Sequence, residues 1–196
     1  SDVYKRQETS FSFRAIHINH NHSSNAKEME NHCIDICHQN NLDLTLKNIR
    51  LSKHKNIENQ LRNKRYESLF NDMSEDEALV LGHHENDQFE TFLYRLFRGS
   101  SPRGLSVIKE ISIRNNKVLC RPFLQVSKNI IIDISKNLKL KFINDHTNND
   151  LSYDRNYIRN KIIPTILDRW KNIHNVMNHN IKPVSYTHLT LPTSHN

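Results

Sequence analysis

A short central segment gathers ionisable side chains that could form a reactive site. Asp87 and Glu90 are three residues apart, so on a helix they would lie one turn apart on the same face. Carboxylates placed in this way can hold Mg²⁺ or orient a substrate ammonium group, and His83 and His84 stand just before them. The same two acidic residues could instead do no more than stabilise the first turn of a helix through its dipole.

Arginines and amides elsewhere in the chain could bind phosphate groups or base edges. Arg98 and Arg121 adjoin a glycine and a proline, which fix the backbone that aims a guanidinium group. The candidates for contact with RNA are Arg98, Arg121, Asn148, Arg155, Asn156 and Arg159. Arg62 and Arg65, one helical turn apart, could reach the phosphates of a nucleotide. Ordinary surface charge is the alternative interpretation of all these residues.

Composition limits the function classes. The 196 residues include 28 basic and 21 acidic ones, a net charge of +7 that favours a polyanionic partner such as nucleic acid. All three glycines, Gly82, Gly99 and Gly104, fall in one window, so no glycine-rich phosphate loop occurs elsewhere. No apolar run is long enough to cross a membrane and no signal peptide is visible, so we expect a cytoplasmic protein without membrane contact.

Cysteine and histidine give weaker signals. Three cysteines are an odd number for a disulfide framework, and Cys33 and Cys37 fall on the expected apolar stripe of a helix, which favours core thiols. His17, His20 and His22 have no cysteine or carboxylate beside them, so a metal site there is disfavoured.

Strand-like and helix-like patterns alternate along the chain. Residues 11–18 and 42–49 are strand-like and flank a helical pattern over 25–39, which predicts a β-α-β unit. A helix over 57–70, a strand over 78–81 and a helix over 85–98 follow. This order favours an α/β fold with a parallel, Rossmann-like sheet and flanking helices. Its ligand crevice would lie beyond the strand ends, where Gly82 and His83 fall.

The later part of the chain is less regular. Phe89, Leu93, Leu96 and Phe97 predict one apolar stripe for the helix over 85–98. A short strand is expected at 118–120 and a C-terminal helical segment from 158 to 170, in which Pro164 either kinks the helix or begins a new one. Residues 1–7 and 183–196 resemble translated sequencing adapter and are excluded, leaving 8–180 as one partial domain.

Several stretches resemble, in family order, the motifs of the tRNA(Ile)-lysidine synthases, a family of PP-loop ATP pyrophosphatases. The segment 81–91 with 98–105 resembles the second signature of that family. The other matching stretches are 14–20, 57–66, 121–124, 145–148 and 153–159. Together they span roughly residues 11–170, and the order of the motifs makes the resemblance specific.

The resemblance implies a function in tRNA modification. Enzymes of this family use ATP to adenylate C2 of the wobble cytidine of a tRNA(Ile) with a CAU anticodon, and free L-lysine then displaces AMP. By family motif, His84 and Asp87 would line the ATP and Mg²⁺ site and Glu90 would face the lysine amine. Gly82, His83, His17, Arg62 and Arg65 would contact ATP. A homodimer is compatible with the sequence.

The chain also departs from the family. It contains no Ser-Gly-Gly, whereas the family begins with a strand and an S-G-G-x-D-S loop that binds pyrophosphate. We therefore expect an internal fragment of the catalytic domain with little or no ligase activity alone. Two alternatives stay open. A PP-loop tRNA cytidine thiolase would need cysteine pairs for an iron–sulfur cluster, and a noncatalytic RNA-binding module would need only the basic surface.

Overall fold

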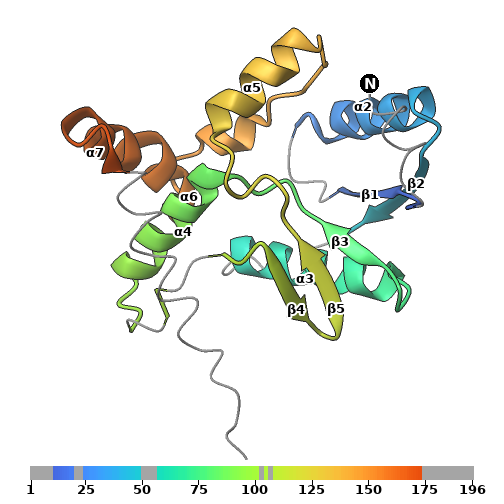
Figure 1. Ribbon diagram of the computed structural model, residues 1–196, viewed down its shortest axis with the longest axis horizontal. Coiled ribbons are helices and arrows are strands. Elements are labelled where there is room, and N and C mark those ends of the chain that lie inside the picture. Colours follow the sequence, from blue (N-terminus) through green and yellow to red (C-terminus); the bar gives the residue numbers. More distant parts are fainter. Residues whose placement is uncertain (1–10, 20–23, 50–56, 102–103, 106–107, 174–196) are drawn as a thin grey trace, which may run out of the picture. The chain divides into compact units, whose positions relative to one another are not determined.

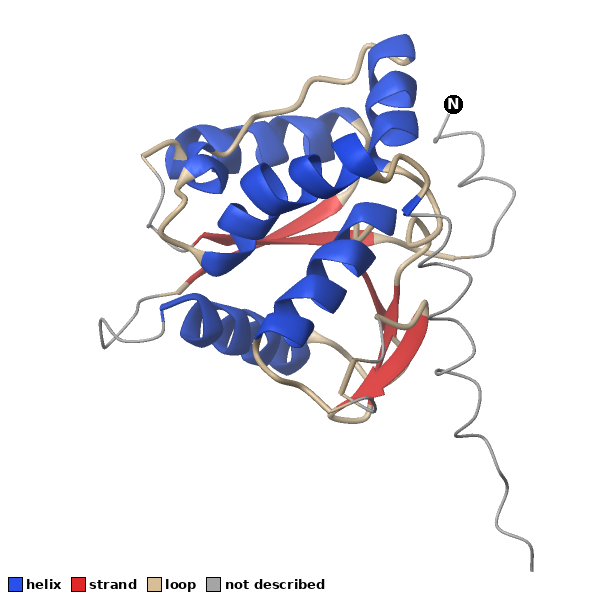
Figure 2. Cartoon of the chain, turned by 90° about the vertical axis from the view of Figure 1, so that its left-hand side faces the viewer, coloured by secondary structure: helices blue, strands red, loops and turns tan. Residues whose placement is uncertain are grey.

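The computed structural model describes residues 11–19, 24–49, 57–101, 104–105 and 108–173. The chain divides into two compact units, one made of residues up to 74 with 141–148, the other of 75–140 with the residues from 149 onward. Each unit is described by itself below, and Figures 1 and 2 show the elements of both. The adapter-like tails and two of the histidines considered above, His20 and His22, lie outside the described residues.

The first unit is built around a parallel pair of strands. β1 (Arg14–Asn19) and β2 (Asp43–Asn48) pair in register from Arg14 opposite Asp43 to Asn19 opposite Asn48, and α2 (Ala26–Gln39) connects them. This confirms the predicted β-α-β unit (Figure 1). α2 ends where Asn41 takes a left-handed conformation, φ 50°, and the Leu42 amide donates to the Cys37 carbonyl at 2.9 Å.

A carboxylate at the end of α3 (Ile57–Asp72) ties that helix to both strands. Asp72 Oδ2 accepts from Arg14 Nη1 at 2.6 Å, and Asp72 Oδ1 lies 2.5 Å from Lys47 Nζ. The Arg14 guanidinium also donates to the Asp72 carbonyl at 2.7 Å. Hydrogen bonds from Arg14 and then Lys47 hold the pKa of Asp72 below its ordinary value.

The second unit contains a mixed sheet. β3 (Ala78–Val80) and β5 (Lys117–Cys120) are parallel, as the pattern predicts, whereas β4 (Ile111–Arg114) is antiparallel to β5. The prediction of a parallel sheet is thus incomplete, because β4 was not expected. Asn115 and Asn116, at φ 49° and 58°, form the tight turn of the β4–β5 hairpin. On one face of the sheet Leu119 is 1% exposed.

The helices of this unit supply its core. They are α4 (Glu85–Phe97), α5 (Lys128–Asn137), α6 (Asp154–Tyr157), a π-helical turn η2 (Ile158–Ile162) and α7 (Ile163–Arg169). A 3₁₀ turn η1 (His146–Asn149) lies between α5 and α6 in the chain, and most of it belongs to the first unit. Phe89 and Leu93 of α4 pack with Ile158 and Ile163. Pro164 stands in the first turn of α7, so the second of the two predicted arrangements, a new helix beginning with proline, is confirmed.

The predicted stripe of α4 is only half right. Phe89 and Leu93 are buried, but Leu96 and Phe97 are exposed, 45% and 58%. Glu90 and Thr91 are buried instead, because this face of α4 turns toward the C-terminal helices. α4 then stops at Gly99, whose φ of +68° is one that side-chain-bearing residues rarely adopt.

Candidate functional site

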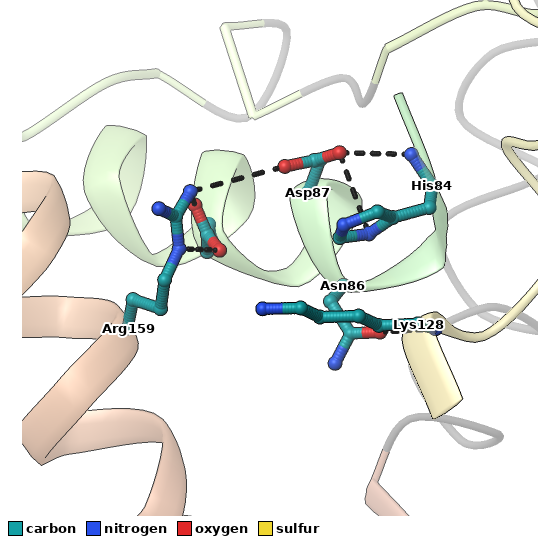
Figure 3. A network of polar contacts seen from close by, with 6 residues as sticks. His84, Asn86, Asp87, Lys128 and Arg159 are labelled. Atoms are coloured by element: carbon teal, nitrogen blue, oxygen red, sulfur yellow. Dashed lines mark hydrogen bonds and ion pairs between the residues drawn. The ribbon is translucent and has the colours of Figure 1, made fainter. Parts of the chain in front are cut away.

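The first turn of α4 fixes the geometry of the site. Gly82, His83 and His84 connect β3 to α4, as the sequence predicts. The backbone amide of His84 donates to Asp87 Oδ2 at 2.8 Å, and His84 Nδ1 lies 3.4 Å from the same oxygen. The Asp87 carboxylate is therefore held against the start of the helix, with its other oxygen, Oδ1, directed elsewhere (Figure 3).

An arginine from the C-terminal helices reaches the acidic face of α4. Arg159 Nε donates to Glu90 Oε1 at 2.6 Å, and Arg159 Nη2 donates to Glu90 Oε2 at 2.7 Å. The same Nη2 lies 4.0 Å from Asp87 Oδ1. Figure 3 shows Arg159 approaching one side of Asp87 while His84 occupies the other. The structure thus brings together four predicted site residues, His84, Asp87, Glu90 and Arg159.

The burial of Glu90 makes its pairing with Arg159 important for stability. The Glu90 side chain is 7% exposed, and a carboxylate this far from water needs a charged partner with good hydrogen-bond geometry. Arg159 provides two parallel bonds, the arrangement that matches a guanidinium group to a carboxylate. In this structure Arg159 therefore orients Glu90, whereas its predicted contact with tRNA stays a prediction.

Two amide side chains between the site residues anchor neighbouring segments, and the sequence reasoning missed both. The Asn86 Oδ1 atom accepts from the Lys128 amide at 3.0 Å, at the start of α5 (Figure 3). The Gln88 amide donates to the Ile108 carbonyl and accepts from the Ile108 amide, both at 2.8 Å. Neighbouring residues at the start of α4 thus serve different purposes. Asp87 and Glu90 face the site, whereas Asn86 and Gln88 fix the backbone around it. Their only signal in sequence is their position beside Asp87.

A second group of predicted residues gathers on Tyr94 of α4. The guanidinium carbon of Arg98 lies 5.2 Å from the centre of the Tyr94 ring, and that of Arg155 lies 5.1 Å from it. Arg98 Nη1 also donates to the Tyr94 hydroxyl at 2.6 Å. Both arginines were predicted to contact RNA, and the structure places them on one aromatic side chain.

Other predicted residues of this unit have structural partners. Arg121 is only 7% exposed, and its Nη1 donates to the Lys109 carbonyl at 2.8 Å and to Ser112 Oγ at 2.9 Å. Asn156 Nδ2 donates to the Asp150 carbonyl at 2.9 Å. Arg121 thus stabilises the chain on either side of the start of β4, and its role in RNA binding stays a prediction.

Four predicted residues belong to the first unit. His17, near the end of β1, has its Nδ1 atom 3.3 Å from Cys33 Sγ of α2. Arg62 and Arg65 are exposed on α3, and Asn148 is exposed on η1. Their predicted contacts with ATP and with tRNA therefore involve side chains at the surface of this unit, with His17 half-buried.

The described residues offer few ligands for a resident metal. Burial raises the pKa of Cys33 and of Cys37, which favours protonated core thiols over metal-binding thiolates. Within the described ranges, no three His, Cys, Asp or Glu side chains gather as a metal cage. Asp87 Oδ1 can supply one carboxylate ligand to Mg²⁺, an ion that commonly takes its remaining ligands from water and substrate phosphates. None of the described helices has the length and apolar character needed to cross a membrane.

Comparison with known proteins places the chain in a family. Residues 2–166 match the PP-loop domain family, so the chain belongs to it. Among curated relatives, tRNA(Ile)-lysidine synthase of Buchnera aphidicola from Acyrthosiphon pisum is 44% identical over 158 residues, which are 80% of this chain and 36% of that protein. The tRNA(Ile)-lysidine synthase of Wigglesworthia glossinidia brevipalpis is 38% identical over 173 residues, 88% of this chain and 43% of that protein. The chain spans about two fifths of their length.

A solved structure supports the fold. The U34-tRNA thiolase of Methanococcus maripaludis, solved with its iron–sulfur cluster, matches 93% of this chain and 65% of its own with a TM-score of 0.69. Its sequence identity is 10%, so the likeness concerns the fold alone. It agrees with an α/β fold of parallel strands and helices.

Proposed function

We propose that this chain provides the lysine- and nucleotide-handling part of a tRNA(Ile)-lysidine synthase. The reaction is ATP-dependent: C2 of the wobble cytidine of a tRNA(Ile) with a CAU anticodon is adenylated, and the amine of free L-lysine displaces AMP. The observation that carries the proposal is the network of His84, Asp87, Glu90 and Arg159. It joins two separate segments whose sequences resemble motifs of this family.

The geometry suits the handling of an ammonium group. Glu90 uses one lone pair of each carboxylate oxygen for Arg159, and each oxygen retains a second one that can accept from an amine. Asp87 Oδ1, 4.0 Å from Arg159, carries the second negative charge of the site. Before Mg²⁺ and ATP bind, two carboxylates and one guanidinium group give these residues a net negative charge, which attracts the lysine cation.

The remaining roles follow from position. Asp87 would bind Mg²⁺ together with ATP phosphates, His84 would hold the Asp87 carboxylate, and Gly82 and His83 would contact the nucleotide at the end of β3. Contacts with ATP by His17, Arg62 and Arg65 belong to the same proposal. So do contacts with tRNA by Arg98, Asn148, Arg155, Asn156 and Arg159, whereas the burial of Arg121 favours a structural role for that side chain. The proposal also includes a cytoplasmic location and a homodimeric state for the protein.

A chimaeric enzyme tests the function directly. Residues 11–170 of this chain would replace the matching segment of the Buchnera tRNA(Ile)-lysidine synthase, and lysidine in tRNA(Ile) would be measured by mass spectrometry of nucleosides. We expect lysidine formation that depends on ATP and lysine. Asp87→Asn should abolish it, whereas Asp133→Asn, at an exposed position of α5, should leave it intact.

The outcomes separate the alternatives. A chimaera that folds and binds tRNA but forms no lysidine would reject the ligase function and favour a noncatalytic RNA-binding module. Full activity of the Asp87→Asn chimaera would reject the role assigned to Asp87.

A further inference from the structure

Lys128, the first residue of α5, is a charged neighbour of the site that the proposed function does not use. Two hydrogen bonds tie the start of α5 to the first turn of α4. The Glu85 amide donates to the Val126 carbonyl at 3.0 Å, and the Lys128 amide donates to Asn86 Oδ1 at 3.0 Å. The backbone of Lys128 is therefore held beside the turn that carries Asp87.

The Lys128 side chain extends from this anchor along the site. Figure 3 shows it running past Asn86 toward the side on which Arg159 stands. The side chain is exposed, and within the described part of the chain its ammonium group has no hydrogen bond or ion pair. Arg159 differs, because its charge is paired with the buried Glu90. Of these two cations, Lys128 is thus the one whose charge is available to a ligand.

The site therefore presents groups of both signs. Glu90 and Asp87 carry negative charge, and each Glu90 oxygen retains a lone pair that can accept from an amine. Lys128 carries positive charge at the end of a long, flexible side chain. A free amino acid also combines both signs, an ammonium and a carboxylate group, in one small molecule. The charges of these residues are thus complementary to an amino acid rather than to a simple amine.

A cation at this place would give the site a selectivity that acidic side chains alone do not provide. Two carboxylates attract any primary amine, including diamines of the same length as lysine. A site that also bonds a second group of its substrate discriminates against analogues that lack the group, because its own polar atoms are then left unpaired. The compact lysine ammonium, with three donors, is suited to binding a carboxylate.

We propose that Lys128 binds the α-carboxylate of the free L-lysine substrate and makes the site selective for an amino acid over a diamine. Asn86 positions Lys128 through the hydrogen bond to its backbone amide. The inference rests on the proposed function in taking lysine as the substrate. It adds a specificity-determining residue that lies outside the stretches resembling the family motifs. A phosphate group of the nucleotide is the competing anion, and the test below separates the two.

A comparison of L-lysine with cadaverine tests this role in the full chain. Cadaverine is the diamine that remains when the carboxylate of lysine is removed, so the two ligands differ in that group alone. NMR titration gives the dissociation constant of each, and the measured quantity is the preference for L-lysine over cadaverine. We expect Lys128→Gln to lower this preference about five- to tenfold, because it removes a charged hydrogen bond to lysine and none to cadaverine.

Two further variants are the controls. Lys136→Gln, in the last turn of α5, removes the same charge about 12 Å farther along the helix and should leave the preference unchanged. Lys128→Arg keeps the charge at the site and should retain the preference within about threefold. A folding defect weakens both ligands alike and leaves their ratio unaffected, so the ratio reports on the carboxylate contact.

The outcomes decide the inference. A preference that Lys128→Gln leaves unchanged would overturn it, and weaker binding of ATP by that variant would then assign Lys128 to a phosphate. An equal fall in Lys136→Gln, or an original chain that does not bind L-lysine, would also overturn it. Lysidine formation by the chimaera is a separate readout. Failure of the ligase together with a preference that depends on Lys128 would reject only the ligase, whereas lysidine formation with a KM for lysine unaffected by Lys128→Gln would reject only the role of Lys128.

Discussion

Arg159 holds both carboxylate oxygens of Glu90, from a position 69 residues later in the chain, with bonds of 2.6 and 2.7 Å. The pair joins the helix that begins the site to the helical segment near the end of the described chain. Because Glu90 is buried and also proposed to face the lysine amine, one interaction serves both stability and function.

Removing the arginine should therefore destabilise the second unit. Arg159→Gln leaves a buried carboxylate without its charged partner, and we expect a loss of about 2–3 kcal/mol in the free energy of unfolding. Urea unfolding followed by fluorescence of Trp170, the only tryptophan, reports on this unit. Adding Glu90→Gln should recover part of the loss, because two neutral amides remain. A loss below about 0.5 kcal/mol, typical of surface positions, would contradict the assignment.

Asp72 predicts a specific response of the first unit to acid. Arg14 and Lys47 lower the pKa of Asp72 in the folded chain, so its contribution to stability is present above its ordinary value of 3.8. That contribution is lost as the pH falls through the lowered folded pKa. The protection factors of the β1 and β2 amides, which correct for the intrinsic pH dependence of hydrogen exchange, should fall over this range in the original chain, and in Asp72→Asn they should already be low at neutral pH. Asp43→Asn, at the exposed start of β2, is the control and should behave like the original. Identical exchange in all three proteins would show that the Asp72 contacts contribute nothing.

The sequence predicted elements best where a long periodic pattern or a buried strand marked them. α2, α3 and α4 lie at their expected positions because their apolar spacing extends over several turns. β4 was missed because Ile111 and Ile113 give only two steps of alternation, and both side chains point to an exposed face. The Asn115-Asn116 turn was the available signal for that hairpin. α5 was also missed, although Ser127, which caps the helix, precedes a run of isoleucines and was the available signal.

The site was predictable in its residues but not in its pairings. The motif resemblance identified Glu90 and Arg159 separately and gave them different ligands, whereas the fold pairs them with each other. The resemblance also identified Arg121 without showing its burial. Pairings between residues this far apart depend on how helices pack, and no local pattern in the sequence encodes that packing.

Gln88 and Asn86 give a prediction about local opening. Gln88→Ala removes two hydrogen bonds to Ile108, each contributing about 1 kcal/mol, so trypsin cleavage after Lys109 should rise about tenfold or more. Asn86→Ala removes the bond to the Lys128 amide and should raise cleavage after Lys128 instead. Each variant is the control for the other, and mass spectrometry of the fragments measures both sites. Equal acceleration at both sites in either variant would mean general unfolding and would reject separate anchors.

Arg121 and Arg98 should respond in opposite ways to the same substitution. Arg121→Lys keeps the charge, but its side chain is one bond shorter than that of arginine and does not place its nitrogen where Nη1 bonds Lys109 and Ser112, so we expect a loss of about 2 kcal/mol in stability. Its affinity for RNA, corrected for the folded fraction, should stay within about twofold of the original, because the side chain is buried. Arg98→Lys, at an exposed position, should leave stability unchanged and weaken RNA binding, because an ammonium group cannot both bond the Tyr94 hydroxyl and present a planar fork to phosphate. Thermal unfolding and titration with a fluorescently labelled tRNA(Ile) anticodon stem-loop measure the two effects. Weaker RNA binding by Arg121→Lys at unchanged stability would restore the role in tRNA binding that the sequence motif implies.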